Sequence, residues 1–283
     1  MTASGTTVTL LHPGEMGWAV GATLLAGGAR TLWVSQGRSP ATRARAVELG
    51  LEEVSTLEAS AKQSQVVLSV VPPHGALHLA RTVAALGFTG IYIDANAVAP
   101  ETAREMGRVL ETAGARFVDG GIIGPASRKP GAARIYLSGQ AANDVAPLFH
   151  AGPVDATILE SPAGAASALK MAYAGWNKGS QALLAAIRAF AMAEGVDSAL
   201  LSEWKISQPE VLGRADRAVT DNARKAWRFV GEMKEIARSL AGAGLPAGFH
   251  EAAGDIYQRL SAYKDTRTPP SVEEAAEKLL RRS

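Results

Sequence analysis

The first forty residues constrain the fold more than any other part of this 283-residue chain. Residues 7–11 form a β-branched and apolar run that is typical of a buried strand. The run leads into a turn at 12–17 with the sequence HPGEMG, and then into an apolar helical pattern over 18–25. A second strand pattern follows at 31–34, before a basic and hydroxyl-rich loop at 35–39. This order of strand, glycine turn, helix and strand predicts a dinucleotide-binding βαβ unit.

The glycine turn has the properties that a pyrophosphate site needs. Gly14 lets the backbone approach a phosphate with no Cβ in between, and Gly17 lets the helix pack closely on the sheet. Glu15 and Met16 belong to this turn, and the helix after it offers N-terminal N–H groups and a positive dipole to the phosphates. His12 stands where the G-x-G-x-x-G pattern has its first glycine, so the turn alone is also compatible with an ordinary βα turn in another α/β protein.

The loop after the second predicted strand indicates which dinucleotide binds. NAD-binding proteins usually carry an acidic residue there, which contacts the ribose 2′-hydroxyl. This chain has Ser35 at that position, followed by Arg38, Ser39 and Arg43. An arginine with a hydroxyl suits a 2′-phosphate, so the sequence predicts NADP(H) as the cofactor.

Strand and helix patterns alternate through the first half of the chain. The further strand patterns lie at 64–71, 90–94, 116–118, 133–137 and 157–159, and the helical patterns between them at 41–49, 74–86, 100–113 and 141–148. Such alternation is typical of a mostly parallel sheet that helices cover on both faces. After Pro162 only helical patterns follow, at 163–194, 198–207, 211–241, 248–260 and 271–281. We therefore expect an α/β fold with a Rossmann-type NADP-binding domain at 1–160, a long interdomain helix, and an all-α substrate and dimerisation domain at 161–283.

Composition excludes several kinds of protein and site. The 29 lysines and arginines nearly balance the 27 aspartates and glutamates, and no long basic run indicates nucleic-acid binding. The absence of cysteine excludes disulfides, thiolate metal ligands and cysteine nucleophiles, and fits a cytoplasmic protein. His74 and His78 have metal-ligand spacing, but no further ligand accompanies them, so we expect no metal site. No apolar run is long enough to predict a membrane span, and no lysine or arginine precedes Arg30 as a signal peptide would require.

Four segments together resemble the β-hydroxyacid dehydrogenase superfamily, which includes 3-hydroxyisobutyrate dehydrogenase and 6-phosphogluconate dehydrogenase. The segments are GEMG at 14–17, DANAVAP at 94–100, DGGIIG at 119–124 and GAASALK at 164–170. In that order they are similar to the family's cofactor turn, the segment after its fifth strand, its substrate loop and the start of its interdomain helix. The sequence AWRFVGEM at 226–233 resembles a branch with a C-terminal domain of unknown function.

The resemblance implies hydride transfer between NADP(H) and a small hydroxy acid or its oxo form, in a homodimer with no nucleic-acid or membrane partner. Lys170 is then the general acid/base, because a desolvated lysine has a lowered pKa and can move a proton near neutral pH. Tyr173 and Asn177 follow at helical spacing and project near Lys170. The family usually has an asparagine where this chain has Ala174, so we expect Asn177 to supply that amide.

Further ligand contacts are expected where strands end, since ligands bind at the carboxyl edge of such sheets. The residues expected to line the cofactor site there are Val71, Pro72, Pro73 and Asn96. A glycine-rich segment is expected to present backbone N–H groups to a substrate carboxylate, and its residues are Gly120, Gly121, Ile122 and Gly124.

Two alternatives stay open. Imine reductases are relatives that commonly carry aspartate or tyrosine at the lysine position, so Lys170 argues against C=N reduction while Tyr173 is compatible with it. A protein that binds NADP(H) without turnover is compatible with the lost first glycine and the missing asparagine. We expect no metal in any of these cases.

Overall fold

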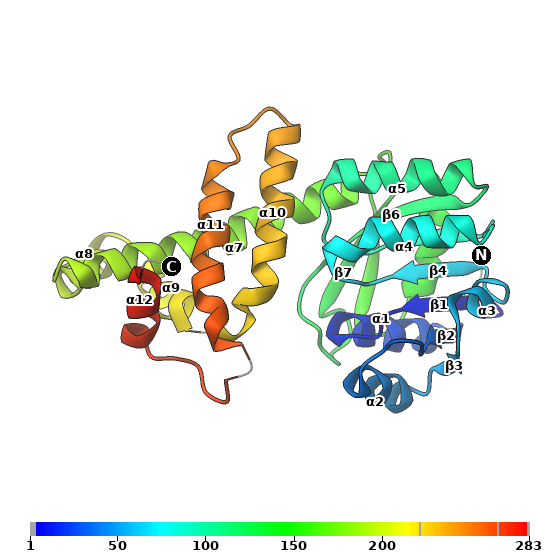
Figure 1. The fold of residues 1–283 in the computed structure, drawn as a ribbon, viewed down its shortest axis with the longest axis horizontal. Helices are drawn as coiled ribbons and strands as arrows, with labels where there is room; N and C mark the ends of the chain where they lie inside the picture. The colour runs from blue at the N-terminus through cyan, green and yellow to red at the C-terminus, as the bar shows by residue number, and fades with distance from the viewer. Residues whose placement is uncertain (1–3, 221, 265, 282–283) are drawn as a thin grey trace. The chain divides into compact units, whose positions relative to one another are not determined.

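The computed structural model describes residues 4–220, 222–264 and 266–281. The chain divides into two compact units, residues 1–170 and 171–283 (Figure 1). Sequence reasoning placed the boundary at 160 instead. The first unit extends ten residues further along the sequence, because the first turns of helix α7 (Ala165–Ala193) pack against one of its strands.

The first unit is built around one eight-stranded sheet, with the strand order β3-β2-β1-β4-β5-β6-β7-β8. Its strands are β1 (Thr7–Leu11), β2 (Arg30–Val34), β3 (Glu52–Val54), β4 (Val66–Ser69), β5 (Ile91–Asp94), β6 (Arg116–Ile123), β7 (Ala133–Ser138) and β8 (Val154–Ile158). Its helices are α1 (Glu15–Ala26), α2 (Pro40–Leu49), α3 (Leu57–Ala61), α4 (Pro73–Ala85), α5 (Pro100–Thr112), α6 (Ala142–Val145) and the 3₁₀ turn η1 (Ala146–Phe149). Neighbouring strands run parallel except for β6 and β7, which confirms the predicted α/β fold with a mostly parallel sheet.

Each face of the sheet has its own core, because successive strand residues point to opposite faces. Val66 and Leu68 of β4 belong to a buried cluster that includes residues of α1. Val67, between them, belongs to a second cluster with residues of α4 and α5. The latter two helices pack side by side over that face, as Figure 1 shows. Burial on both faces explains why these strands have continuous apolar sequences.

The sequence prediction is wrong in three places in this unit. It missed β3 and α3, which span three and five residues and are too short for a clear periodicity. It assigned only 116–118 to a strand and expected a loop beyond, whereas β6 continues to Ile123. Its second half pairs antiparallel with β7, with Gly120 opposite Leu137 and Ile123 opposite Arg134.

All regular elements in the described residues of the second unit are helices, as predicted. After α7 it consists of α8 (Asp197–Ser207), α9 (Pro209–Thr220), η2 (Ala223–Lys225), α10 (Ala226–Gly242), α11 (Gly248–Leu260), η3 (Ser261–Tyr263) and α12 (Val272–Leu280). Arg188 of α7 is buried, and its guanidinium donates to Asp197 at 2.7 Å and to Asp216 at 2.5 Å. This pairing joins α7, α8 and α9. In the described part of the chain, no helix has both the length and the apolar character that crossing a membrane requires.

Candidate functional site

The turn between β1 and α1 has the geometry of an anion site. Gly14 is the N-cap of α1, and no described side chain caps that helix. A helix N-terminus of this kind can bind an anion through its first N–H groups. A Cβ on Gly17 would lie 2.3 Å from the backbone oxygen of His12, so only glycine fits there. The turn is therefore as tight as the sequence predicted.

His12 takes the backbone conformation of the glycine that it replaces. Its φ of 73° lies in the left-handed region, which most residues with a Cβ avoid. The ring Nε2 lies 3.2 Å from the position that a Cβ on Gly14 would occupy, so the imidazole lies against the turn. The ring Nδ1 is buried without a hydrogen-bond partner among the described residues. Burial, and then the charges of Arg38 and Arg45, lower the pKa of His12.

Arg38, in the loop after β2, has a guanidinium nitrogen, Nε, that makes no hydrogen bond within the described part of the chain. Its side chain is half-buried. Burial lowers the pKa of the Arg38 guanidinium. A buried guanidinium N–H without a partner is costly, and an anion bound there would remove that cost.

The other three residues predicted for this loop have structural partners. Ser39 is the N-cap of α2, and its Oγ accepts from the backbone N–H of Thr42 at 3.3 Å. Arg43 donates to Glu53 of β3 at 2.6 Å and lies 5.6 Å from the ring centroid of Trp33. Hydrogen bonds from Arg43 and then Ser35 lower the pKa of Glu53. Ser35, Ser39 and Arg43 thus have partners within the protein, while the Nε of Arg38 has none among the described residues; the cofactor contacts of all four stay a prediction.

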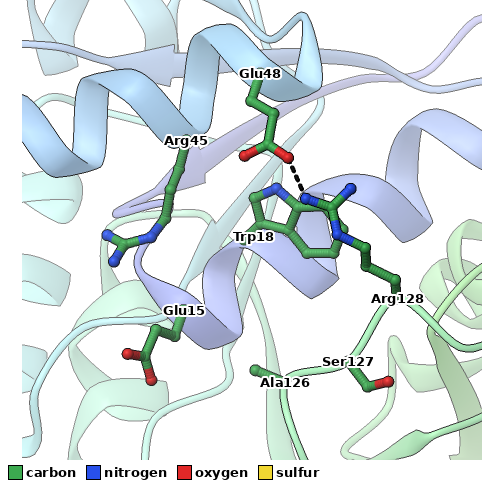
Figure 2. Close-up of a pocket in the computed structure, with 7 residues that line it drawn as sticks. All are labelled: Glu15, Trp18, Arg45, Glu48, Ala126, Ser127 and Arg128. Atoms are coloured by element: carbon green, nitrogen blue, oxygen red, sulfur yellow. Dashed lines mark hydrogen bonds and ion pairs between the residues drawn. The ribbon is translucent and has the colours of Figure 1, made fainter.

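A pocket of about 270 Å³ next to α1 contains residues that sequence reasoning missed. Its lining residues are Glu15, Trp18, Arg45, Glu48, Ala126, Ser127 and Arg128 (Figure 2). Arg128 comes from the segment after β6, lies 4.5 Å from the ring centroid of Trp18 and pairs with Glu48. Apart from Glu15, which belongs to the predicted cofactor turn, no sequence motif marks these positions, because α1, α2 and the segment after β6 meet only in the fold.

Asp119 organises the start of α7. One of its carboxylate oxygens accepts from the N–H groups of Gly164 at 2.8 Å and Ser167 at 3.0 Å, and from the hydroxyl of Ser138 at 3.0 Å. The other oxygen accepts from the Ser167 hydroxyl at 2.6 Å. A carboxylate at a helix N-terminus is stabilising, so Asp119 fixes where α7 begins.

Lys170 lies one turn further along α7 and is held against β6. A Cβ on Gly121 would stand 2.5 Å from the Ala166 backbone oxygen and 3.2 Å from Cβ of Lys170, so glycine permits this close approach. Lys170 itself is half-buried. Gly120 and Gly121 therefore lie in strand β6, where the backbones of Asp94 and Ala166 pack closely against them, instead of forming the expected loop. Ile122 is buried beside them. Gly124, with φ of 124°, does form a turn.

Asn96 and Asp94 lie inside the protein at the end of β5. Asn96 accepts from the Val71 N–H at 2.5 Å, and its Nδ2 donates to Ser69 at 3.0 Å and also to Asp94. Asn96 is 3% exposed and its amide is used internally, where it holds Val71 ahead of Pro72 and Pro73; its predicted ligand contact stays a prediction. Burial, and then the charge of Asp119, raise the pKa of Asp94 to about 8, which keeps that carboxyl neutral at pH 7.

Two predicted residues of α7 belong to the second unit. Tyr173 is 47% exposed. Asn177 donates its Nδ2 to the Tyr173 backbone oxygen at 2.9 Å, so half of its amide is engaged with its own helix. The substrate role of Asn177 stays a prediction.

Comparison with known families decides the identification. A family model described as the NAD binding domain of 6-phosphogluconate dehydrogenase matches residues 7–152, more than half of the chain. A second model, a domain of unknown function (DUF1932), matches residues 191–260. The chain belongs to the β-hydroxyacid dehydrogenase family. The predicted resemblance is confirmed, including the branch that its C-terminal domain defines.

Individual relatives agree with this membership. An uncharacterized 28.5 kDa protein from Methanothermus fervidus is 32% identical over 166 residues, and the match spans 59% of this chain and 63% of that protein. A solved conserved protein of unknown function, described as structurally similar to 3-hydroxyacid dehydrogenases, is 26% identical with a TM-score of 0.70, covering 97% of this chain and all of that one.

More distant structures share the fold of this family. Mycobacterium tuberculosis 3-hydroxyisobutyrate dehydrogenase, solved with L-serine, is 18% identical with a TM-score of 0.68, over 98% of this chain and 99% of that one. An Aspergillus terreus reductive aminase, solved with NADPH, cyclohexanone and allyl amine, is 18% identical with a TM-score of 0.56, over 97% of this chain and 99% of that one.

Proposed function

We propose that this protein is an NADP(H)-dependent oxidoreductase acting on a small hydroxy acid or its oxo form. The observation that carries the proposal is the buried Nε of Arg38, which has no hydrogen-bond partner among the described residues. It lies beside the turn between β1 and α1, where position 17 accepts only glycine. The turn belongs to a domain that matches a family of NAD-binding domains. Arg38 supplies a donor for the 2′-phosphate that distinguishes NADP from NAD. The bound cofactor would supply or accept the hydride.

Lys170 is the proposed general acid/base. The reaction needs a group that gives a proton to the substrate oxygen, or takes one from it, within hydrogen-bond reach. Asp119 fixes the start of α7, and Gly121 lets the helix approach β6 closely, so these two residues position Lys170. Both are positioning residues in this proposal.

Arg38→Ala tests the choice of cofactor. Loss of a charge-assisted hydrogen bond is expected to cost roughly 1.5–3 kcal/mol, which weakens NADPH binding about ten- to a hundred-fold. NADH, without the 2′-phosphate, is expected to bind equally to wild type and variant. Fluorescence titration of both cofactors measures this directly.

Arg30→Ala is the matched control, since Arg30 is an exposed arginine of β2 that pairs with Glu52. It is expected to leave the affinities for both cofactors unchanged. An unchanged ratio of NADPH to NADH affinity in Arg38→Ala would contradict the assignment of NADP(H). If neither cofactor bound the wild type at tens of micromolar, the oxidoreductase proposal would be wrong.

Reduction of C=N bonds is the second candidate. Tyr173 is exposed on α7 three residues after Lys170, and the fold is shared with a reductive aminase solved with NADPH. A panel that contains cyclic imines beside oxo acids separates the candidates by the rate of NADPH oxidation. Turnover of imines alone would favour the second candidate.

A homodimer is proposed through α7. Its exposed apolar side chains follow a spacing of three, four and seven residues, which is typical of a helix-packing seam: Tyr173, Trp176, Leu183, Ile187 and Phe190. The same stripe on a second copy is complementary to it under two-fold symmetry. The double variant Leu183→Glu/Phe190→Glu is therefore expected to halve the mass measured by light scattering after gel filtration.

Ile206→Glu is the control for this variant, because Ile206 is an apolar residue of α8 that is even more exposed than Leu183 and Phe190. It is expected to keep the dimer mass. A monomeric wild type, or a double variant that stays dimeric, would exclude α7 as the interface.

A further inference from the structure

His12 is a residue whose position the proposed function does not explain. It carries a side chain in a backbone conformation that is unfavourable for a residue with a Cβ, at a place where glycine has no such cost. Its imidazole lies against Gly14, in the turn that faces the cofactor phosphates in this fold. Strain of this kind is typical of residues that bind ligands.

Two buried nitrogen atoms near this turn have no partner among the described residues, Nδ1 of His12 and Nε of Arg38. They come from different segments, the end of β1 and the loop after β2. A buried donor or acceptor without a partner is unfavourable, so two of them in one neighbourhood indicate a missing polar ligand.

The charges around His12 define that ligand as an anion. The charged groups that act on its imidazole in the described structure are Arg38, from the loop after β2, and Arg45, from α2. Of the nearby acids, Glu15 begins α1 and is exposed on the pocket that Arg45 also lines, and Glu48 of α2 pairs with Arg128. A phosphate dianion provides the acceptors and the charge that this basic group lacks.

We propose that His12 is a third contact, with Arg38 and Arg45, for the 2′-phosphate of NADP(H), and that its imidazole takes up a proton when the phosphate binds. This inference rests on the proposed use of NADP(H). It makes His12 a specificity-determining residue and makes the affinity for NADP(H), but not for NAD(H), depend on pH.

The sign of the pH dependence follows from the two states of the imidazole. In the free protein, burial and two arginines lower the pKa of His12, so the ring is neutral at pH 7. A bound dianion offsets the arginine charges and raises that pKa. The added affinity is therefore fully present below the free-state pKa of His12 and is lost as the pH rises through the bound-state pKa.

Calorimetric titration with adenosine 2′,5′-bisphosphate tests the proton uptake without any catalytic step. At pH 7.5 the 2′-phosphate is already a dianion, so a proton taken up comes to the protein. Titrations in two buffers of different ionisation enthalpy are expected to show uptake of a substantial fraction of one proton by wild type. His12→Asn, which tolerates a positive φ and does not titrate, and His12→Gly are expected to take up none.

The affinity for NADPH provides the second readout. His12→Asn is expected to weaken NADPH binding about tenfold at pH 6.5 and less than twofold at pH 8.5, since only the charge-assisted contact is lost. His78→Asn, at an exposed histidine of α4, is the matched control and is expected to behave as wild type.

Each outcome bears on one of the two proposals. If NADPH and the bisphosphate bind but His12→Asn takes up the same proton as wild type, the role of His12 is overturned and the use of NADP(H) stands. Equal proton uptake with NADH would place His12 at the pyrophosphate and overturn the 2′-phosphate assignment. If neither phosphate ligand binds wild type, the proposed function fails, and the inference fails with it.

Discussion

Lys170→Met is expected to lower kcat by about 10²–10⁴-fold, the usual loss when a general acid/base is removed. Methionine keeps much of the length of the side chain that α7 presents near Gly121, but it cannot carry a proton. The dissociation constant for NADPH is expected to stay the same, because the proposed phosphate contacts lie in the turn after β1 and the loop after β2, and not on α7. Steady-state kinetics with the best substrate of the oxo-acid and imine panel, together with cofactor titration, measure both quantities.

Lys205→Met serves as the control, since Lys205 is an exposed lysine of α8. It is expected to retain wild-type kcat. A loss of less than tenfold in Lys170→Met would show that the proton comes from elsewhere, and Tyr173→Phe then identifies whether the tyrosine supplies it.

The stability of the protein is expected to fall by about 4 kcal/mol between pH 5 and pH 8 because of Asp94, and Asp94→Asn is expected to remove that fall. Burial and the charge of Asp119 raise the pKa of Asp94 from 3.8 to about 8. Since the folded-state pKa lies above the unfolded value, the contribution is fully present below pH 3.8 and is lost as the pH rises through 8. Urea unfolding followed by circular dichroism, at pH 5, 6.5 and 8, measures the free energy of unfolding.

Asp144→Asn is the control for this measurement, because Asp144 is an exposed carboxylate that pairs with Arg116. It is expected to keep the pH dependence of wild type. A variant Asp94→Asn whose stability falls with pH as steeply as wild type would show that another group titrates in this range.

The order and type of the long elements follow from the sequence, because burial on both faces gives strands such as β4 and β5 unbroken apolar runs. The position where β6 ends cannot be predicted from the sequence. Gly120 and Gly121 suggest a loop when taken alone, but β7 pairs with them, and the backbones of Asp94 and Ala166 approach too closely for a Cβ. A tertiary partner decides the conformation of those glycines.

The candidate site is predictable only where one segment determines it. The glycine turn is local, so its form was correctly predicted from residues 12–17. The roles of the charged residues depend on partners from elsewhere in the fold. Arg38 and Arg43 are equivalent in the sequence, yet Glu53 of the unpredicted β3 binds Arg43 and leaves Arg38 open. Asn96 likewise follows a strand as ligand-binding residues do, but its amide is occupied by Val71, Ser69 and Asp94.

The strand order also bears on how the chain avoids aggregation while it is synthesised. From β5 to β8 each strand pairs with the one that precedes it, so a chain that emerges N-terminus first can extend the sheet one strand at a time. Each apolar strand is then an unprotected edge only until the next one emerges. The two final edges are unattractive to other molecules, because β3 is short and carries Glu52 and Glu53, while β8 exposes Asp155 and Thr157. A nascent chain that stalls after β5 would leave the edge at Ile91–Asp94 open to other molecules until β6 emerges.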